Sequence, residues 1–407
     1  MNVQSRTKRT VCLIAPGDIC NPVGGMEKFA SLLSAWLQTH DCRTIVIYQS
    51  LSRKVETKVN PVLVIKNPEN SSVQPYRKQV PYIFYMFFLI FVDIIKTFKI
   101  ISLNKKFKFQ VLHAVDLAFD GFAAVIASWI IKVPVISHCH GIRYYNLQKQ
   151  LAGRELAKTC ALFGHLLEIF AVKHSKIVIT VNAEARNFFI SLGFPPEKIR
   201  VLPIGTDISA FRKADSLKNS VRRELGIGEG EVLICFIGRL VAEKNVQGLI
   251  NAYVDLLAGG RLMNSHLLIV GSGSLRNELE ENIAGSFKHK VIFAGARTDV
   301  PRLLLASDIF VLPSFFEGCP TALMEAMVSG KAIVASDLQS IREIIEDGYN
   351  GLLVKPGNKE SLSMTLERLY SDGALRDMLA KNTKHQAVNY DLETVFPKIL
   401  EIYKEVT

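Results

Sequence analysis

Short apolar runs that end at a glycine, a serine or a proline recur at close intervals in the second half of this 407-residue chain. Uncharged runs of this kind, bounded by turn residues, are typical of strands buried on both faces of a parallel sheet. We expect such strands at 231–238, 266–271, 291–295, 308–313 and 331–336. Neighbouring parallel strands require crossover helices, so the pattern predicts an α/β architecture.

Two glutamates eight positions apart follow the strand expected at 308–313. Glu317 lies in a Gly/Pro-containing loop, and Glu325 lies on a helix whose first turn we expect to contain Pro320. Ligands of open α/β sheets bind at the carboxyl ends of the strands, and this loop leaves such an end. The alternative is an ordinary helix start whose acidic residues suit the helix dipole.

Backbone and basic groups near that edge favour an anionic ligand. The N–H groups of Gly318 and Cys319 precede a helix N-terminus, which is suited to hold a polar or anionic group. Arg239 and Lys244 follow the strand at 231–238 and are placed to bind a diphosphate, one as a fork and one as a point charge. An ordinary solvated loop is the alternative for the two cations. The Gly-Ser-Gly turn at 271–273 is weak evidence of phosphate binding by itself.

Read together, these motifs resemble retaining nucleotide-sugar glycosyltransferases of family 4, which have the two-domain GT-B fold. The resemblance covers most of the chain and is dense from 231 to 356. It rests on Gly-Arg-x4-Lys at 238–244, Gly-Ser-Gly at 271–273, Glu-x7-Glu at 317–325 and Glu-Ile-Ile-Glu-Asp-Gly-Tyr-Asn-Gly-Leu-Leu-Val at 343–354. Several spaced motifs in the expected order are far more specific than any one of them.

The resemblance implies two Rossmann-like, doubly wound domains that face each other across a cleft. Residues 1–205 would bind the acceptor and 206–385 the nucleotide sugar, with a last helix within 386–407 crossing back to the first domain. Glu317 would contact the donor sugar, Glu325 the ribose hydroxyls, and Arg239 and Lys244 the diphosphate. The remaining donor-site residues would be Gly24, Gly25, Gly271, Gly273, Gly318, Cys319, Pro320 and Thr321.

One segment departs from the family pattern. Many relatives carry Gly-Gly-x-Pro-Glu after the strand at 331–336, whereas this chain has Gln339-Ser-Ile-Arg-Glu343. Two glycines and a proline are replaced, so we expect the pocket near this turn to be altered. Glu343 is expected to be structural.

The amino-terminal half fits the same resemblance. A strand at 10–16 and a helix at 28–39 flank Gly24 and Gly25. These glycines either admit donor phosphates or acceptor to the backbone, or simply form the helix entry. Strand ends also carry His138, His140 and Asp116. Relatives have a histidine beside the reacting sugar, and His140 matches it better than His138, while Asp116 is a weak candidate for an acceptor contact.

The cysteine spacing and the acidic residues argue against several kinds of site, namely disulfides, a zinc site and a metal-dependent donor site. The seven cysteines have no C-x-x-C spacing, so a disulfide framework or zinc site is not expected, and we infer a reduced cytosolic interior. The apolar run 11–15 is too short for a signal-peptide core. The chain contains no Asp-x-Asp, the sign of a metal site in other glycosyltransferases. We therefore expect no metal and no cofactor other than the sugar nucleotide substrate.

Charge is unevenly distributed and suggests an anionic membrane surface as a partner. Residues 1–205 hold 26 Lys/Arg and 12 Asp/Glu, whereas 206–407 hold 23 and 26. The segment 79–92 is apolar and continues into lysines at 96–108. Pro81 to Val92 is short for a span, so a helix lying at the membrane surface is expected, with a buried helix as the alternative. Nucleic acid is not expected, because no recognition motif is present.

These features predict a metal-independent hexosyltransferase that acts on a glycan or polyprenyl-diphosphate-linked acceptor, peripheral to the inner face of the cytoplasmic membrane. A glycoside hydrolase also uses two carboxylates, but it has no use for a cationic phosphate loop. Another GT-B enzyme, such as a nucleotide-sugar epimerase, and an inactive GT-B scaffold remain alternatives. The sequence leaves the nucleotide, the sugar and the oligomeric state open.

Overall fold

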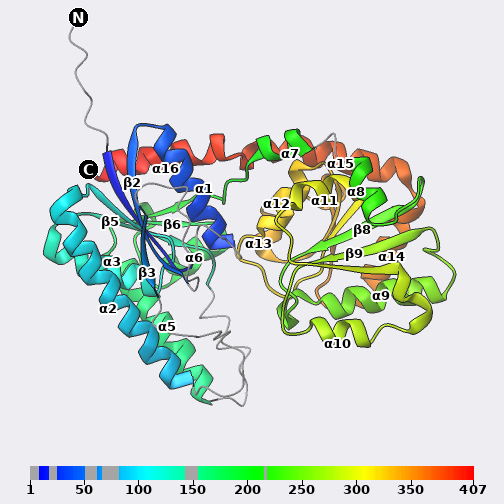
Figure 1. The fold of residues 1–407 in the computed structure, drawn as a ribbon, viewed down its shortest axis with the longest axis horizontal. Helices are drawn as coiled ribbons and strands as arrows, with labels where there is room; N and C mark the ends of the chain where they lie inside the picture. The colour runs from blue at the N-terminus through cyan, green and yellow to red at the C-terminus, as the bar shows by residue number, and fades with distance from the viewer. Residues whose placement is uncertain (1–8, 18–24, 51–61, 67–81, 143–154, 215–217) are drawn as a thin grey trace, which may run out of the picture. The chain divides into compact units, whose positions relative to one another are not determined.

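The computed structural model describes residues 9–17, 25–50, 62–66, 82–142, 155–214 and 218–407. The chain forms two compact units. Unit 1 contains Met1–Pro203 and Phe396–Thr407, and unit 2 contains Ile204–Val395. Each unit is an α/β body built on a parallel sheet (Figure 1).

Unit 1 is built on a sheet whose described strands run in the order β3-β2-β1-β4-β5-β6-β7. Its strands are β1 (Arg9–Ala15), β2 (Cys42–Ser50), β3 (Val62–Lys66), β4 (Val111–Ala114), β5 (Val135–Cys139), β6 (Ile177–Thr180) and β7 (Ile199–Val201). Its helices are α1 (Gly25–Thr39), α2 (Tyr82–Phe107), α3 (Phe119–Ile131), α5 (Glu155–His174) and α6 (Ala183–Ser191), with the short η1 (Pro196–Lys198). The strand order reverses between β1 and β4, which is the switch point of a doubly wound sheet.

Unit 2 repeats the plan with the strand order β10-β9-β8-β11-β12-β13. The strands are β8 (Val232–Ile237), β9 (Ser265–Val270), β10 (Val291–Gly295), β11 (Ile309–Leu312), β12 (Ala332–Ser336) and β13 (Leu352–Val354). The helices are α7 (Ile208–Ala214), α8 (Lys218–Glu224), α9 (Val246–Ala258), α10 (Arg276–Glu281), α11 (Val300–Ala306), α12 (Thr321–Val328), α13 (Gln339–Arg342), α14 (Lys359–Ser371) and α15 (Gly373–Gln386). Short 3-10 turns are η3 (Ala242–Lys244), η4 (Gly285–Lys290) and η5 (Ala387–Tyr390).

The strands of unit 2 are apolar because helices cover both faces of the sheet. Figure 1 shows α9, α10 and α14 on one side of it and α8, α11, α12 and α15 on the other. Every residue of β8 and of β11 is buried. In α9, Leu249, Ile250, Tyr253, Leu256 and Leu257 recur at helical spacing and are all buried. The sheet order reverses between β8 and β11, so the loops that follow these two strands meet at a switch point.

The last helix, α16 (Leu392–Val406), belongs to unit 1 from Phe396 onward. The hydroxyl of Tyr403 lies 2.6 Å from Nδ1 of His113 on β4. Arg200 forms an ion pair with Glu405 at 3.2 Å, and Arg9 donates to the hydroxyl of Thr407 at 3.0 Å. The end of the chain is therefore an integral part of unit 1.

Helix α2 is neither wholly buried nor wholly exposed. Val92 and Ile100 are buried, while Phe91, Ile94 and Phe98 are 54%, 45% and 67% exposed. Lys96, which we had grouped with the membrane-facing lysines, is instead buried and paired with Asp120 at the start of α3. That part of the expectation is wrong, because the aliphatic stem and the charge of Lys96 both lie inside the unit.

A second carboxylate, Asp93, lies beside this buried pair. Burial raises the pKa of Asp93 to about 8, Lys96 opposes this effect, and Asp120 and Asp116 add to it. Burial lowers the pKa of Lys96, but Asp120 and Asp93 more than offset this, so the net pKa is raised. Lys96 pairs with Asp120 and is also close enough to act on Asp93. Asp93 nevertheless keeps its proton at neutral pH, because its pKa is about 8.

This arrangement predicts that the protein loses stability as pH rises from 6.5 to 8. In the folded state Asp93 holds its proton up to about pH 8, whereas an aspartate in the unfolded chain releases it near its ordinary pKa of 3.8. Stability from this group is therefore lost as pH rises through the folded pKa, by at most about 1.4 kcal/mol per pH unit. Urea unfolding should show the slope in the wild type and a flatter one in Asp93→Asn. The exposed Glu401→Gln should keep the wild-type slope, and equal slopes in all three proteins would contradict the account.

Candidate functional site

The carboxyl edge of the unit 2 sheet brings Lys244 and Glu317 into contact. Lys244 ends η3 in the loop after β8, and Glu317 lies between β11 and α12. Nζ of Lys244 lies 2.6 Å from Oε1 of Glu317, and the hydroxyl of Ser314 donates to the same oxygen at 2.6 Å. The side chains of Lys244 and Glu317 are only 16% and 5% exposed. The pair therefore joins the two loops at the switch point in a largely dehydrated setting.

Helix α12 presents the other predicted residues of this loop. It begins at Thr321, and Pro320 is its N-cap. The expectation that Pro320 lies in the first turn of the helix is therefore wrong by one position. Cys319 is half-buried, and desolvation raises the pKa of its thiol to about 12, so it stays protonated. Glu325 is buried within α12 at 5% exposure. Gly318 precedes Cys319 in the same loop.

Arg239 occupies a different setting from Lys244. Its side chain is 54% exposed and pairs with Glu243 at 3.4 Å. An exposed pair of this kind contributes little to stability. The guanidinium therefore stands in solvent in the loop after β8, where it can change partner at low cost.

The glycines at 271 and 273 are required by a close contact between two loops. A Cβ at Gly271 would lie 1.9 Å from the carbonyl oxygen of Gly238, and φ there is +139°. A Cβ at Gly273 would lie 2.2 Å from the carbonyl oxygen of Leu240. The N–H of Leu240 donates to the carbonyl of Ser272 at 2.9 Å. The Gly-Ser-Gly turn thus packs directly on the loop that carries Arg239.

The segment that departs from the family pattern supports Glu317 by a contact that sequence reasoning missed. The hydroxyl of Ser340, on α13, donates to the backbone carbonyl of Glu317 at 2.7 Å, and Ser340 is buried. The side chain of Ser340 thus fixes the loop that carries Glu317. Ser314 was missed as well, and its position three residues before Glu317 was the available signal. Glu343 is the C-cap of α13.

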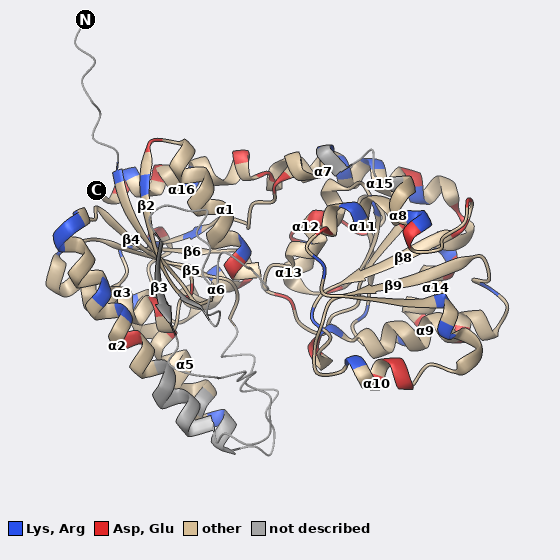
Figure 2. Ribbon diagram, viewed as in Figure 1, with Lys and Arg blue, Asp and Glu red and all other residues tan. Residues whose placement is uncertain are grey.

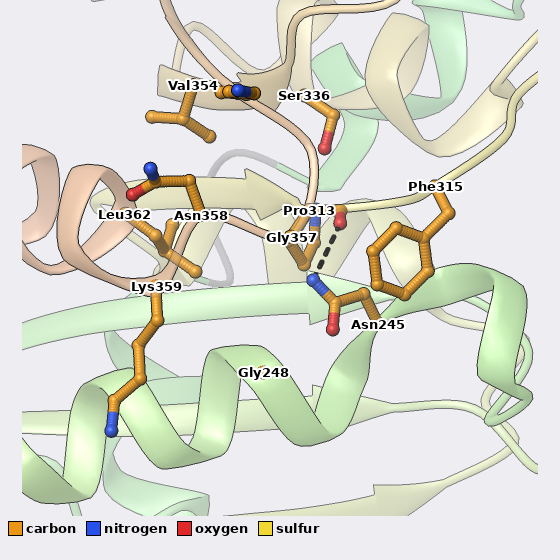
Figure 3. Close-up of a pocket in the computed structure, with 11 residues that line it drawn as sticks. Asn245, Gly248, Pro313, Phe315, Ser336, Val354, Gly357, Asn358, Lys359 and Leu362 are labelled. Atoms are coloured by element: carbon orange, nitrogen blue, oxygen red, sulfur yellow. Dashed lines mark hydrogen bonds between the residues drawn. The ribbon is translucent and has the colours of Figure 1, made fainter.

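A small pocket borders the same loop on the side of α9 and α14 (Figure 3). Asn245 Nδ2 donates to the carbonyl of Pro313 across it at 3.2 Å. Its lining residues are Asn245, Gly248, Pro313, Phe315, Ser336, Val354, Lys355, Gly357, Asn358, Lys359 and Leu362. None of the predicted donor-site residues lines it, so it is a separate feature of the unit.

Unit 1 carries a stack of three imidazoles at the ends of β4 and β5. The rings of His113 and His138 are parallel within 5° at 5.7 Å, and those of His138 and His140 within 16° at 4.5 Å. Phe29 of α1 meets His138 and His140 edge-on at 4.6 and 5.3 Å. The sequence predicted His140 and His138 as competitors, whereas the structure places them together.

All three histidines remain neutral at physiological pH. Burial lowers the pKa of His113 to about 3, with a smaller effect of His140. Burial also lowers the pKa of His138, and both neighbouring histidines add to this effect. For His140, burial lowers the pKa to about 4, although the carbonyl of Val115 opposes it. Neither ring nitrogen of His140 has a hydrogen-bond partner of normal geometry among the described residues.

The remaining predicted residues of unit 1 are only partly described. Gly24 lies outside the described residues, and Gly25 is the first residue of α1. The carboxylate of Asp116 accepts from the N–H of Phe119 at 3.1 Å, so it caps the start of α3. Within the described ranges, no three His, Cys, Asp or Glu residues are grouped to hold a metal ion. In the same part of the chain, none of the helices has the length and apolar character needed to span a bilayer.

Comparison with known proteins places the chain in a family. The family described as Glycosyltransferase Family 4 matches residues 23–210, and the one described as Glycosyl transferases group 1 matches 218–386. The chain belongs to glycosyltransferase family 4, the group 1 glycosyl transferases, and its two units have the GT-B fold.

Particular relatives show which members the chain is similar to. It is 28% identical over 307 residues to the Escherichia coli UDP-Gal:alpha-D-GlcNAc-diphosphoundecaprenol alpha-1,3-galactosyltransferase, covering 74% of this chain and 77% of the relative. It is 31% identical over 242 residues to a Campylobacter jejuni N,N'-diacetylbacillosaminyl-diphospho-undecaprenol alpha-1,3-N-acetylgalactosaminyltransferase, covering 56% and 60%. The crystal structure of Anabaena HepE with UDP-glucose has a TM-score of 0.74 at 21% identity, covering 97% of this chain and 99% of HepE.

The loop contact at Gly271 leads to a test of how the site is built. In Gly271→Ala, the new Cβ would overlap the carbonyl of Gly238 at a positive φ, so the two loops must separate. We expect a loss of about 3 kcal/mol or more in unfolding free energy, measured by urea denaturation. Gly285→Ala is the matched control, because open space surrounds that position. A loss no larger than in the control would show that the contact is not required.

Proposed function

We propose that the protein is a retaining, metal-independent glycosyltransferase. It moves a hexose-type sugar from a nucleoside-diphosphate sugar to a glycan or polyprenyl-diphosphate-linked acceptor in cell-surface polysaccharide synthesis. The observation that carries the proposal is the Lys244–Glu317 pair at the switch point of unit 2 in a member of family 4. The named activities of the E. coli and C. jejuni relatives, which both use diphosphoundecaprenol-linked acceptors, support the acceptor class.

Sugar transfer requires positive charge beside the leaving nucleoside diphosphate. As the bond between the anomeric carbon and the phosphate oxygen breaks, the acceptor oxygen attacks that carbon from the same face and passes its proton to the departing phosphate oxygen. The nucleoside diphosphate leaves with increased negative charge. Lys244 and the exposed Arg239 are placed to stabilise that charge, and the N-terminus of α12 adds its dipole.

The contact between Lys244 and Glu317 prepares both groups before the donor binds. Glu317 fixes the ammonium of Lys244 in the loop, and Ser314 and Ser340 fix Glu317 in turn. A donor diphosphate is then met by a cation that is already dehydrated and oriented, which lowers the reorganisation needed at the moment of reaction. Glu317 stays beside the sugar, and Glu325 is assigned to the ribose hydroxyls.

Replacing Glu317 or Lys244 by alanine should separate catalysis from folding. We expect Glu317→Ala to lower the rate of sugar transfer by at least about 10²- to 10³-fold. Circular dichroism should show that this variant remains folded. Lys244→Ala should lower kcat more than it raises KM for the donor, because its charge acts mainly as the diphosphate leaves. The measurement is the steady-state release of nucleoside diphosphate in the presence of acceptor.

Control variants of the same residue types come from exposed ion pairs of unit 2. Glu367 pairs with Arg261 and Lys359 pairs with Asp255, and both are at least 38% exposed. Glu367→Ala and Lys359→Ala should transfer sugar at the wild-type rate. Near-normal turnover by Glu317→Ala would defeat the assignment. Turnover without any acceptor would favour an epimerase instead.

The proposal includes an anionic membrane surface as the place of action, reached through unit 1. The apolar ridge, defined as Phe91, Ile94 and Phe98 of α2 with Leu162 and Leu166 of α5, is exposed, and α2 and α5 pack on each other. The exposed lysines 99, 105, 106 and 108 belong to α2 or directly follow it. Figure 2 shows basic residues at the C-terminal end of α2. Apolar side chains beside exposed lysines are the pattern of a helix lying in a membrane interface.

Polar substitution in the apolar ridge should weaken membrane binding. For Phe98→Ser we expect at least about a tenfold loss of binding to vesicles of phosphatidylglycerol and phosphatidylcholine, measured by co-sedimentation. The wild-type protein should also lose binding as salt rises. Met364→Ser is the control, because Met364 is 71% exposed on unit 2. Wild-type binding by Phe98→Ser and by a second variant, Ile94→Ser, would contradict the membrane assignment.

A further inference from the structure

The histidine stack in unit 1 is tied to the C-terminal helix by a buried hydrogen bond. Tyr403 of α16 and His113 of β4 are both fully buried, and the tyrosine oxygen lies 2.6 Å from Nδ1 of His113. The direction of this hydrogen bond decides which ring nitrogen of His113 carries the hydrogen. The hydrogen bond fixes the tautomer and the plane of His113.

The orientation of His113 is passed on by stacking. His138 lies parallel to His113 on one side and to His140 on the other. His138 is fully buried, and neither of its ring nitrogens has a hydrogen-bond partner among the described residues. Its orientation therefore depends on ring packing, not on a polar anchor. At the end of the stack that lies away from His140, Tyr403 is the polar anchor.

Helix α16 supports the stack at a second point. Phe396 meets Phe29 edge-on at 5.9 Å, and Phe29 in turn lies edge-on to both His138 and His140. Two residues of the last helix, seven positions apart, thus hold the same group of rings. This spacing is about two helical turns, so both side chains lie on one face of α16.

We propose that Tyr403, His113 and His138 are positioning residues, which hold the imidazole of His140 in one orientation and in its neutral form for its role in sugar transfer. The inference rests on the proposed function and on the family resemblance, which implies that His140 is the histidine beside the reacting sugar. It adds that the C-terminal helix is a necessary part of the active site through Tyr403. A neutral imidazole can accept or donate a hydrogen bond to a sugar hydroxyl, whereas an imidazolium can only donate.

The groups around His140 agree with a neutral ring. On β4 and β5 its neighbours are His113 and His138, and a proton on any one of the three disfavours a proton on the others. From α16 comes the neutral phenol of Tyr403, and from α1 the uncharged Phe29. The carboxylates of Asp116 and Glu168 act on the adjacent thiol of Cys139. Burial is the largest effect on the pKa of His140 and keeps it well below neutral.

The test removes a single hydroxyl. In Tyr403→Phe the ring packing remains, but His113 loses its anchor. We expect kcat to fall by about tenfold while KM for the donor changes less than about twofold, because the proposed diphosphate-binding residues belong to unit 2 and are unchanged. The acidic limb of the kcat profile should move up by about one pH unit, because a loosened His140 takes up a proton more easily. Wild-type kcat and an unmoved acidic limb would overturn the proposal.

Tyr253→Phe is the matched control. Tyr253 is also fully buried, and it donates one hydrogen bond, to the carbonyl of Ser265 at 2.9 Å in unit 2. Both variants lose a buried hydroxyl, so both lose stability, but only Tyr403→Phe should change the pH profile. The same profile in both variants would reduce Tyr403 to a structural role and overturn the proposal.

A second readout is independent of activity. In ¹⁵N-histidine NMR of the wild-type protein, His140 should stay neutral down to about pH 5, and titration near pH 6.5 would overturn the proposal. In Tyr403→Phe, but not in Tyr253→Phe, the His140 signals should shift. If the wild-type protein transferred no sugar from any donor, the proposed function would fail. The NMR comparison would still decide whether the stack orients His140.

Discussion

The contact between Lys244 and Glu317 is the interaction on which the donor side of this protein depends. It joins the loops after β8 and β11 at the point where the sheet order reverses, and both side chains are largely removed from water. A buried carboxylate without its cation would be costly, so neither loop can move away independently. The close approach of Gly271 to Gly238 and the hydrogen bond from Ser340 hold the surrounding backbone in register with this pair.

The candidate sites of the two units differ in the kind of side chain that they use. Unit 2 uses charge, with a preset ammonium and carboxylate and an exposed guanidinium at Arg239 that is free to change partner. Unit 1 uses neutral rings, because burial keeps His113, His138 and His140 unprotonated. The proposed function assigns a charged leaving group to the first environment and an uncharged sugar to the second. In this chain each environment is built at the carboxyl ends of parallel strands.

Much of the fold followed from the sequence because apolar runs and family motifs are local. The five strands expected in the second half are present, and the loops after two of them carry Lys244 and Glu317. Ser340 was not foreseen, because its hydroxyl acts on a backbone carbonyl 23 residues away. The burial of Lys96 was not predicted for the same reason, because its partner, Asp120, lies on another helix. Contacts between distant segments depend on packing, and sequence spacing does not report packing.

The central claim is that unit 2 holds a donor site for a nucleoside-diphosphate sugar, with Lys244 on the diphosphate. The most direct measurement is thermal stabilisation of the purified protein by a panel of nucleotide sugars and free nucleoside diphosphates, with no metal added. The account predicts that one nucleotide raises Tm in the wild type, with and without its sugar, and that Lys244→Met loses most of the shift given by the free nucleoside diphosphate, which carries the full charge of the leaving group. Folded wild-type protein that is stabilised by none of them would contradict the account and favour a GT-B scaffold without a working donor site.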